Sequence, residues 1–513
     1  MTTAAALTAA ESGAAWLNRR TTVGFGVLTA AVGLGALGDG LLRATPWGVN
    51  TAIWVTALAA ALTCLLRWQR IDATAGGRSM LLVAVFFASG MALRDSPAVR
   101  TLDGLALLVT LSLGLAALRA WPGQLRIAAL TDYALTVCYA CVHAAAGAYP
   151  LLFREIGWRE VAAGGRRSAA LAAARGALIA LPLLVLFGGL FVAADATFER
   201  LVTRAFRWDA ATLFGHLYGF VLCTWVSGGL LRGVLIERRP SAPPLRRAPR
   251  PWLGPIEMAT FLGLLNALFL SFVLVQVRYF FGGASTVLAT DGMTYAAYAR
   301  RGFFELVAVA ALVLPLLLLT HSMLRKEHPV NERLYRLLAG SLVALLFVVM
   351  ASALQRMFLY QRLYGLTELR LYTTAFMGWL GAVFVWFVAT VLRGRRRRFG
   401  IGALTSGLAV VVALNLLNPD ELIIRTNATR VAQGSASQTL DDLYAASLSA
   451  DGVPALLVAL PVLPAEQQDV LARQLLHRWS PPAHQDWRTW NWGRAQAWRA
   501  VAAHEATLKE MAR

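Results

Sequence analysis

The chain has 513 residues, of which 58% are hydrophobic and only 15% are charged. A soluble globular domain is about 45–50% apolar and about 25% charged, so this composition excludes an ordinary water-soluble enzyme and a disordered or collagen-like chain. The 48 Lys and Arg residues outnumber the 28 Asp and Glu residues, which gives a formal net charge of +20. The composition predicts a membrane protein, with the lipid bilayer as its first partner.

Almost all of the positive charge is arginine, since Lys326 and Lys509 are the only lysines. The arginines form short clusters between apolar runs and do not follow one basic, aromatic-rich surface, so we expect no nucleic-acid partner. The tendency of cytoplasmic loops to carry Lys and Arg explains the pattern better. The four cysteines lie inside apolar runs, so no disulfide framework is expected.

About 12 runs are long enough, or nearly so, to cross a bilayer, which needs roughly 20 mostly apolar residues. The third and fourth runs are the weakest, because Arg94, Asp95 and Arg100 leave only a tight connection between them. We predict an all-α fold, a polytopic transmembrane helical bundle of about 11–12 spans. The runs begin at Thr22, Val49, Ser79, Leu102, Ile127, Gly176, Ala210, Ile256, Gly302, Leu337, Leu371 and Gly400.

Polar residues become frequent after Pro419, and no further spanning run follows. Helical spacing of apolar residues is visible within this part at 440–450 and at 465–479. We therefore divide the chain into four parts: a cytoplasmic N-terminal segment (1–20), an N-terminal group of spans (21–153), a main transmembrane bundle (154–418) and a soluble, extracytoplasmic helical tail (419–513).

Orientation follows from the connections richest in Arg and Lys, which can all be cytoplasmic because they alternate along the chain. These connections are 154–175, 237–250, 325–336 and 393–398. The N-terminal third fits this scheme if one of the runs at 79, 102 or 127 does not cross the membrane, or if the N-terminus is outside. We favour the first solution, with 11 spans, the N-terminus inside and the tail outside.

Most polar residues at membrane depth gather toward the outer side in this orientation. Charged side chains in spans are costly and mark either a functional site or a paired structural network. For any single residue the structural role is the more frequent one, and Arg301 with Glu305 has the four-residue spacing of a simple helical ion pair. The coincidence of several on one side favours a shared polar cavity. The candidate binding residues are Asp195, Glu199, Arg278, Arg300, Arg301, Glu305, Arg356, Glu368, Arg370 and Asp420.

Other motifs are weaker. The string from Cys138 to His143 imitates a haem or metal motif, but haem attachment needs the histidine directly after the second cysteine, so we interpret it as packing. His216 and His321 are each interpreted as bonded structural residues. No phosphate-binding Gly-rich loop, zinc-protease helix or nucleophile elbow occurs, so no metal, cofactor or catalytic residue is assigned. The Trp-rich segment 485–492 fits sugar binding, contact with lipid headgroups, or packing against the membrane face of the domain.

Four strings resemble the bacterial multispanning proteins of the domain of unknown function 4153/4173 group. They are YARRGFFE (298–305), YGLTELRLY (364–372), NPDELIIRTN (418–427) and LDDLYAASLSADGVP (440–454). The resemblance is carried by residues 298–454, and residues 1–150 contribute little. It implies a multi-pass protein of the bacterial inner membrane with no established activity, and it supplies no substrate, cofactor or catalytic residue.

Three functions stay open. The leading hypothesis is a transporter or small-solute-binding membrane protein with an outer-side polar cavity. The second is a membrane enzyme that acts on a lipid-linked or envelope substrate, with a carboxylate such as Asp195 or Glu305 as general base. The third is a sensor or assembly subunit that uses the tail to bind a partner. The expected ligand is accordingly a small polar solute or an envelope lipid, and no protein partner is assigned.

Overall fold

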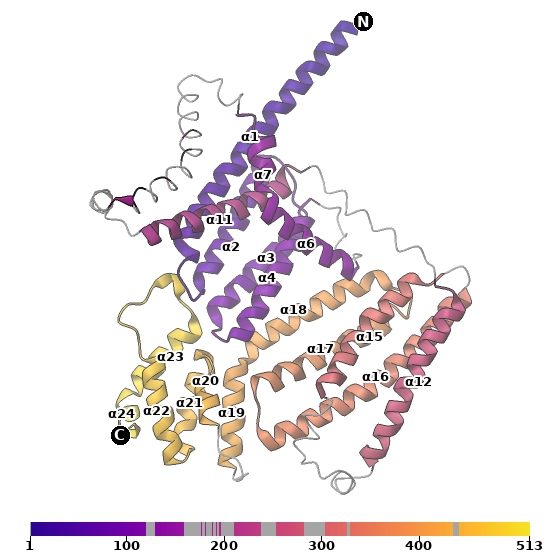
Figure 1. The fold of residues 1–513 in the computed structure, drawn as a ribbon, viewed down its shortest axis with the longest axis vertical. Coiled ribbons are helices and arrows are strands. Elements are labelled where there is room, and N and C mark those ends of the chain that lie inside the picture. Colours follow the sequence, from indigo (N-terminus) through magenta and orange to yellow (C-terminus); the bar gives the residue numbers. More distant parts are fainter. Residues whose placement is uncertain are drawn as a thin grey trace. The chain divides into compact units, whose positions relative to one another are not determined.

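The structure, a computed structural model, describes residues 2–119, 129–158, 210–237, 253–281, 303–325, 329–433 and 441–512, with a few isolated positions between 176 and 195. Side chains are described from Arg19 in the first helix. In these ranges the chain is helical, and its β-type pairing is a single isolated bridge between Leu253 and Leu324. The prediction of an all-α fold is confirmed (Figure 1).

Ten helices in the described ranges are long and apolar enough to cross a membrane. The number is eleven if the bent pair formed by α6 (Leu130–Ala146) and the segment Ala148–Glu155, with a bend of 45°, is one span. The two weakest runs form α3 (Ala75–Leu93) and α4 (Pro97–Ala117), joined by residues 94–96. The predicted run at 176 lies almost wholly outside the described residues. A multi-pass helical bundle is the result.

The chain divides into two compact units. Unit 1 comprises Met1–Val85, Leu111–Ala120 and Leu135–Pro240, and unit 2 comprises Phe86–Thr110, Trp121–Ala134 and Ser241–Arg513. Helices α3 and α4 contribute residues to both units. Each unit has its own hydrophobic core.

Unit 1 is organised by close contact between α1 (Thr2–Leu42) and α11 (Ala210–Leu235), with α2 (Val49–Trp68) beside them. A Cβ atom at Gly35 would collide with the side chain of Thr224, so glycine permits this approach. Small residues commonly bring membrane helices together, because lipid leaves no hydrophobic drive between them. Buried Glu155 accepts hydrogen bonds from Arg232 Nε (3.0 Å) and Nη2 (2.8 Å), which pairs the charge.

Unit 2 contains a bundle of α12 (Pro255–Phe281), α15 (Phe303–Met323), α16 (Pro329–Tyr364), α17 (Glu368–Thr390) and α18 (Phe399–Leu417). Helix α16 contacts α12, α15 and α17 and so lies at the centre of the bundle (Figure 1). Its buried Tyr335 donates a hydrogen bond to the Leu317 carbonyl on α15 (2.7 Å), which satisfies the phenol inside an apolar core.

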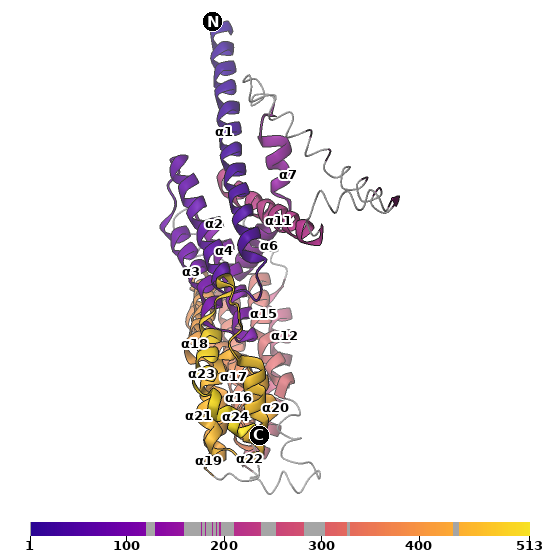
Figure 2. The same cartoon turned by 90° about the vertical axis from the view of Figure 1, so that its left-hand side faces the viewer.

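The last part of unit 2 is a set of short helices with a second core. They are α19 (Pro419–Ala432), α20 (Asp442–Ser447), η3 (Ala450–Gly452), α21 (Val453–Ala459), η4 (Leu460–Val462), α22 (Ala465–Trp479), η5 (Trp487–Thr489), α23 (Trp492–Ala503) and α24 (Glu505–Met511). Leu471, Leu475 and Trp479 follow one face of α22 and are buried in this core, as the helical spacing at 465–479 predicts. Both views show these helices grouped together (Figures 1 and 2).

We expect Phe384→Ala to lower the melting temperature of the full chain in detergent. Phe384 is fully buried on α17 and packs edge-on against Phe347 of α16, with ring centroids 6.4 Å apart. Removing a buried Phe side chain costs about 3–5 kcal/mol in protein cores. The neighbouring Val385 is 59% exposed, so Val385→Ala is the matched control and should have little effect. Equal losses from both variants would contradict this packing of α16 against α17.

Candidate functional site

The site lies in unit 2, where α18 ends and α19 begins. Asn418 ends α18 with φ 49° and ψ 81°, in the left-handed region that asparagine enters more readily than most residues. Pro419 then starts α19, where its missing N–H is not needed. This turn places Asp420 in the first turn of α19, fully buried. Its Oδ2 accepts hydrogen bonds from the Ser449 backbone N–H (3.1 Å) and from the Ser449 hydroxyl.

Asp451 is a second buried carboxylate, in η3. Its Oδ2 accepts the backbone N–H groups of Asp95 (2.7 Å) and Ser96 (2.9 Å), just before α4. The first N–H groups of a helix have no partner within the helix, and a carboxylate there satisfies them. Ser449 Oγ also lies 3.4 Å from Asp451 Oδ2, so one serine hydroxyl joins Asp420 to Asp451.

Asp95 completes what we name the acid cluster, which is Asp95, Asp420 and Asp451. Its Oδ1 lies 3.6 Å from Arg494 Nε and 3.9 Å from Arg100 Nη1. The arginine from α23 and the arginine from α4 therefore partly neutralise this acid. The result is a contact between the tail and the connection 94–96 that is made mostly of buried polar groups.

The end of α18 is tied to the same connection. Arg94 Nε donates a hydrogen bond to the Asn415 carbonyl (2.7 Å), and Asn415 Nδ2 donates to Asp103 Oδ1 on α4 (2.8 Å). Asp103 is buried within a span-length helix, where a charged side chain is costly. The hydrogen bond from the Asn415 amide therefore supplies a partner that water would otherwise provide. These contacts align the end of α18 with the α3–α4 connection.

Burial controls the electrostatics of the acid cluster. It raises the pKa of Asp451 from 3.8 to about 6 against the opposing effect of the Ser96 and Asp95 N–H groups, and it also raises the pKa values of Asp95 and Asp420. The Oδ1 atoms of Asp420 and Asp451 are buried without a hydrogen-bond partner among the described residues. A protonated carboxyl is cheaper to bury there than an ionised one.

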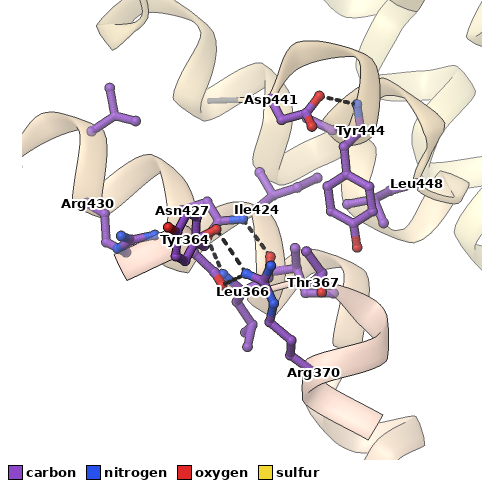
Figure 3. A pocket seen from close by; sticks show the side chains of 14 residues that line it. Tyr364, Leu366, Thr367, Arg370, Ile424, Asn427, Arg430, Asp441, Tyr444 and Leu448 are labelled. Atoms are coloured by element: carbon purple, nitrogen blue, oxygen red, sulfur yellow. Dashed lines mark hydrogen bonds between the residues drawn. The ribbon is translucent and has the colours of Figure 1, made fainter. Parts of the chain in front are cut away.

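A cavity of about 320 Å³ opens beside the acid cluster, and we name it the arginine pocket (Figure 3). Its walls come from the α16–α17 connection, α19 and α20. Tyr444 joins α20 to the start of α17, because the Tyr444 hydroxyl accepts the Glu368 backbone N–H (2.7 Å). Burial raises the pKa of Tyr444 to about 12, so the phenol is neutral. The lining residues are Tyr364, Gly365, Leu366, Thr367, Arg370, Ile423, Ile424, Asn427, Arg430, Val431, Asp441, Tyr444, Ala445 and Leu448.

The α16–α17 connection is held in place by Asn427 of α19. Asn427 Oδ1 accepts the Leu366 N–H (2.7 Å), and its Nδ2 donates to the Leu366 carbonyl (2.8 Å). Gly365 has φ +76°, a conformation that favours glycine. A Cβ atom there would also lie 2.7 Å from both Asn427 Oδ1 and Arg430 Nη1. The connection therefore needs a glycine at 365 for two independent reasons.

Two guanidinium groups are fixed at this connection. Arg370 Nη1 donates to the carbonyls of Tyr364 (3.0 Å) and Gly365 (2.5 Å), and its guanidinium lies 4.1 Å from the centre of the Tyr360 ring. Arg430 comes from α19 and donates from Nη2 to the Arg362 carbonyl (2.5 Å), and its Nη1 occupies the space that a Cβ atom on Gly365 would need. Figure 3 shows the two arginines approaching the connection from different helices. Fixed guanidinium forks suit bidentate hydrogen bonds to carboxylate or phosphate oxygens.

Three of the ten candidate residues lie at this site. Arg370 lines the pocket, Glu368 begins α17 beside it, and Asp420 belongs to the acid cluster. Glu305 is exposed in the first turn of α15, and Arg356 is half-buried on α16.

The remaining candidate residues lie in unit 1 or have side chains outside the described residues. Asp195 is exposed and belongs to unit 1. Arg278 lies in α12 with its side chain outside the described residues, and Glu199, Arg300 and Arg301 lie wholly outside them. That all ten residues share one cavity stays a prediction.

Three histidines have local partners. His143 Nε2 lies 2.9 Å from Glu237 Oε2, and His216 Nδ1 lies 2.7 Å from Asp39 Oδ2. His321 Nδ1 lies 3.3 Å from Arg396 Nη1. Within the described ranges, no group of three or more His, Cys, Asp or Glu side chains could hold a metal ion.

Sequence reasoning missed the residues that join the tail to the α3–α4 connection. Asp451 and Ser449 stand in the string LDDLYAASLSADGVP that carries the family resemblance, but nothing in the string shows what they contact. Asp103 is an acid inside an apolar run, a signal that could have marked it. Asn491 and Arg494 had no comparable signal.

Comparison with known proteins gives one match. The sequence matches the family described as Domain of unknown function (DUF4153) over residues 81–459. This range contains the acid cluster and the whole arginine pocket, and it ends before α22. No curated protein and no solved structure matches the chain.

We expect the stability of the full chain to fall as the pH rises from about 4 to about 6, in part because of Asp451. An acid whose pKa is higher in the folded state binds more protons when folded, so stability is lost on passing from its ordinary pKa of 3.8 up to about 6. Each pH unit in this window is worth about 1.4 kcal/mol, or about 3 kcal/mol in all. Melting temperatures measured across this window test the expectation.

Asp451→Asn keeps an oxygen acceptor for the Asp95 and Ser96 N–H groups but cannot titrate, so its pH dependence should be shallower than that of the wild type. Asp95 and Asp420 keep part of the slope, because burial raises their pKa values too. Asp469→Asn removes an acid that pairs with Arg473 on the surface of α22 and is the control. A pH profile for Asp451→Asn that is as steep as that of Asp469→Asn, or steeper, would contradict the assignment.

Proposed function

The chain belongs to the DUF4153 family, whose description assigns no function, and from its site we propose that it is a multi-pass membrane protein that binds a small anionic solute in the arginine pocket. The observation that carries the proposal is the placement of Arg370 and Arg430 at Gly365 on the wall of one cavity. The family resemblance and the arginine-rich loops favour the bacterial inner membrane as the setting, with the pocket on its outer side.

The size and lining of the pocket support a small ligand. Ligand pockets are typically about 300–1,000 Å³, and this cavity, at about 320 Å³, lies at the lower end. Ile424 and Leu448 supply apolar surface, whereas Thr367 and Tyr444 add polar groups. Such a lining orients a ligand by a few directed contacts and holds the remainder by apolar contact.

The charge of the pocket supports an anion. Arg370 and Arg430 contribute two positive charges, and Asp441 contributes one negative charge at the rim. Asp441 Oδ1 accepts the Tyr444 N–H (2.9 Å) as the N-cap of α20, so this carboxylate already has a structural role. Backbone carbonyls hold Arg370 before any ligand arrives, which lowers the ordering cost of binding.

The position of the pocket favours capture of the solute at the membrane surface over its passage through the bundle. The pocket residues 364–367 lie between the spans Pro329–Arg362 and Glu368–Thr390, and its other residues belong to α19 and α20. A sensor role is the second candidate, because Arg370 lies in the first turn of α17. A ligand on Arg370 would act directly on the end of a membrane span.

We expect Arg370→Gln and Arg430→Gln each to weaken binding of inorganic phosphate or glycerol phosphate to the full chain by roughly 10–100-fold. A hydrogen bond to a charged group is worth about 1.5–3 kcal/mol, which corresponds to this range. Isothermal titration calorimetry in detergent measures the affinities.

Arg425→Gln is the matched control, because Arg425 lies on the same helix as Arg430 but pairs with Glu421 on the surface. Arg370→Lys and Arg430→Lys keep the charge and should lose less affinity than the glutamine variants. An equal loss in Arg425→Gln, or no binding of either probe to a folded wild type, would refute the proposed anion site.

A further inference from the structure

The tail exposes three tryptophans close together in sequence, in what we name the tryptophan loop (486–492). Trp487 is 63% exposed, and Trp490 and Trp492 are each 42% exposed. We propose that these three side chains lie among the lipid headgroups of the bilayer that α3 crosses and so anchor the tail to the membrane surface. The proposal is independent of ligand binding in the arginine pocket.

Asn491 fixes the height of the loop relative to a membrane span. This residue is 1% exposed, and its Nδ2 donates hydrogen bonds to the carbonyls of Met91 (3.0 Å) and Arg94 (2.9 Å). Met91 lies in the last turn of α3 and Arg94 directly follows the helix, where backbone carbonyls have no N–H donor within the helix. The loop is therefore fastened to the point where a span-length helix ends.

The exposed side chains of α18 locate the boundary of the apolar layer close to the end of α3, where Asn491 binds. Arg94 bonds to the Asn415 carbonyl, so the end of α3 lies beside the end of α18. The last residues of α18, Leu416 and Leu417, are 77% and 59% exposed, as expected for side chains that face lipid. The next residue, Asn418, is buried and polar. The change from exposed apolar to polar residues marks the membrane surface next to Asn491.

The loop presents its tryptophans outward from this anchor. Asn491 is buried between two exposed neighbours, Trp490 and Trp492, whose ring centroids are 6.3 Å apart. The backbone is held as well, since Arg494 Nη2 donates to the Thr489 carbonyl (2.6 Å). The three rings are thus displayed on a supported segment and are not packed into the core of the tail.

Lipid is the occupant that this arrangement fits. Tryptophan is enriched at membrane interfaces, because its large apolar ring and its N–H group suit a boundary between lipid and water. Packing against the membrane face of the domain, one of the roles open from the sequence, does not account for rings that are 42–63% exposed. Arg499 adds a cation 5.4 Å from the centre of the Trp492 ring, where lipid phosphates would meet it.

The test is the depth of single spin labels on the full chain in vesicles of phosphatidylethanolamine and phosphatidylglycerol. The four native cysteines, which are unpaired, are replaced by serine, and labels are placed by Trp487→Cys, Leu416→Cys and Lys509→Cys. Leu416 is the lipid reference, and Lys509, whose side chain is 63% exposed on α24, is the tail control. The measurement compares collision with oxygen, which enters lipid, and with a water-soluble nickel chelate.

We expect the oxygen-to-nickel ratio at 487 to exceed that at 509 several-fold and to lie below that at 416. A ratio at 487 equal to that at 509 would place the loop in water, available to a sugar or a soluble partner, and would overturn the proposal.

A second measurement needs no cysteine replacement. The fluorescence lost in Trp487→Phe, Trp490→Phe and Trp492→Phe, made together, isolates these rings from the other tryptophans. This lost component should be quenched by lipids brominated near the headgroup and shielded from aqueous iodide. The opposite result, quenching by iodide alone, would overturn the proposal.

Discussion

The carboxylate of Asp451 bonds to the backbone N–H groups of Asp95 and Ser96, and the structure around the site depends on this contact. It joins a residue of the tail to the connection between two membrane helices. Ser449 extends it to Asp420 at the start of α19, the helix that supplies one wall of the arginine pocket. A hydrogen-bonded carboxylate thus relates the tail, the spans and the candidate binding site to one another.

The cost of burying a carboxylate explains why the pKa of Asp451 is raised. Buried carboxylates lose their hydration, and the hydrogen bonds from the Ser96 and Asp95 N–H groups return only part of it, so the pKa of Asp451 rises to about 6. The arginine pocket is different, because its charges stand at an open cavity and are held by backbone carbonyls. The cluster therefore serves to hold the tail in place, whereas the pocket has charge that a ligand can use.

Much of the fold could be predicted from the sequence, but much of the site could not. Apolar runs report spans directly, because a bilayer requires long stretches without charge, and even the doubtful runs at 79 and 102 form helices. Arg370 and Asp420 were found because charges beside spans are conspicuous. Asp451 and Asn491 were not, because their partners lie 356 and 400 residues away in the chain and no local pattern encodes such pairing.

A density map of the full chain in lipid nanodiscs with saturating inorganic phosphate tests whether the arginine pocket binds an anion. We expect a ligand density within hydrogen-bonding distance of Arg370 and Arg430, next to Gly365, and no such density when phosphate is left out. A map that resolves both guanidinium groups with nothing between them in saturating phosphate would contradict the account.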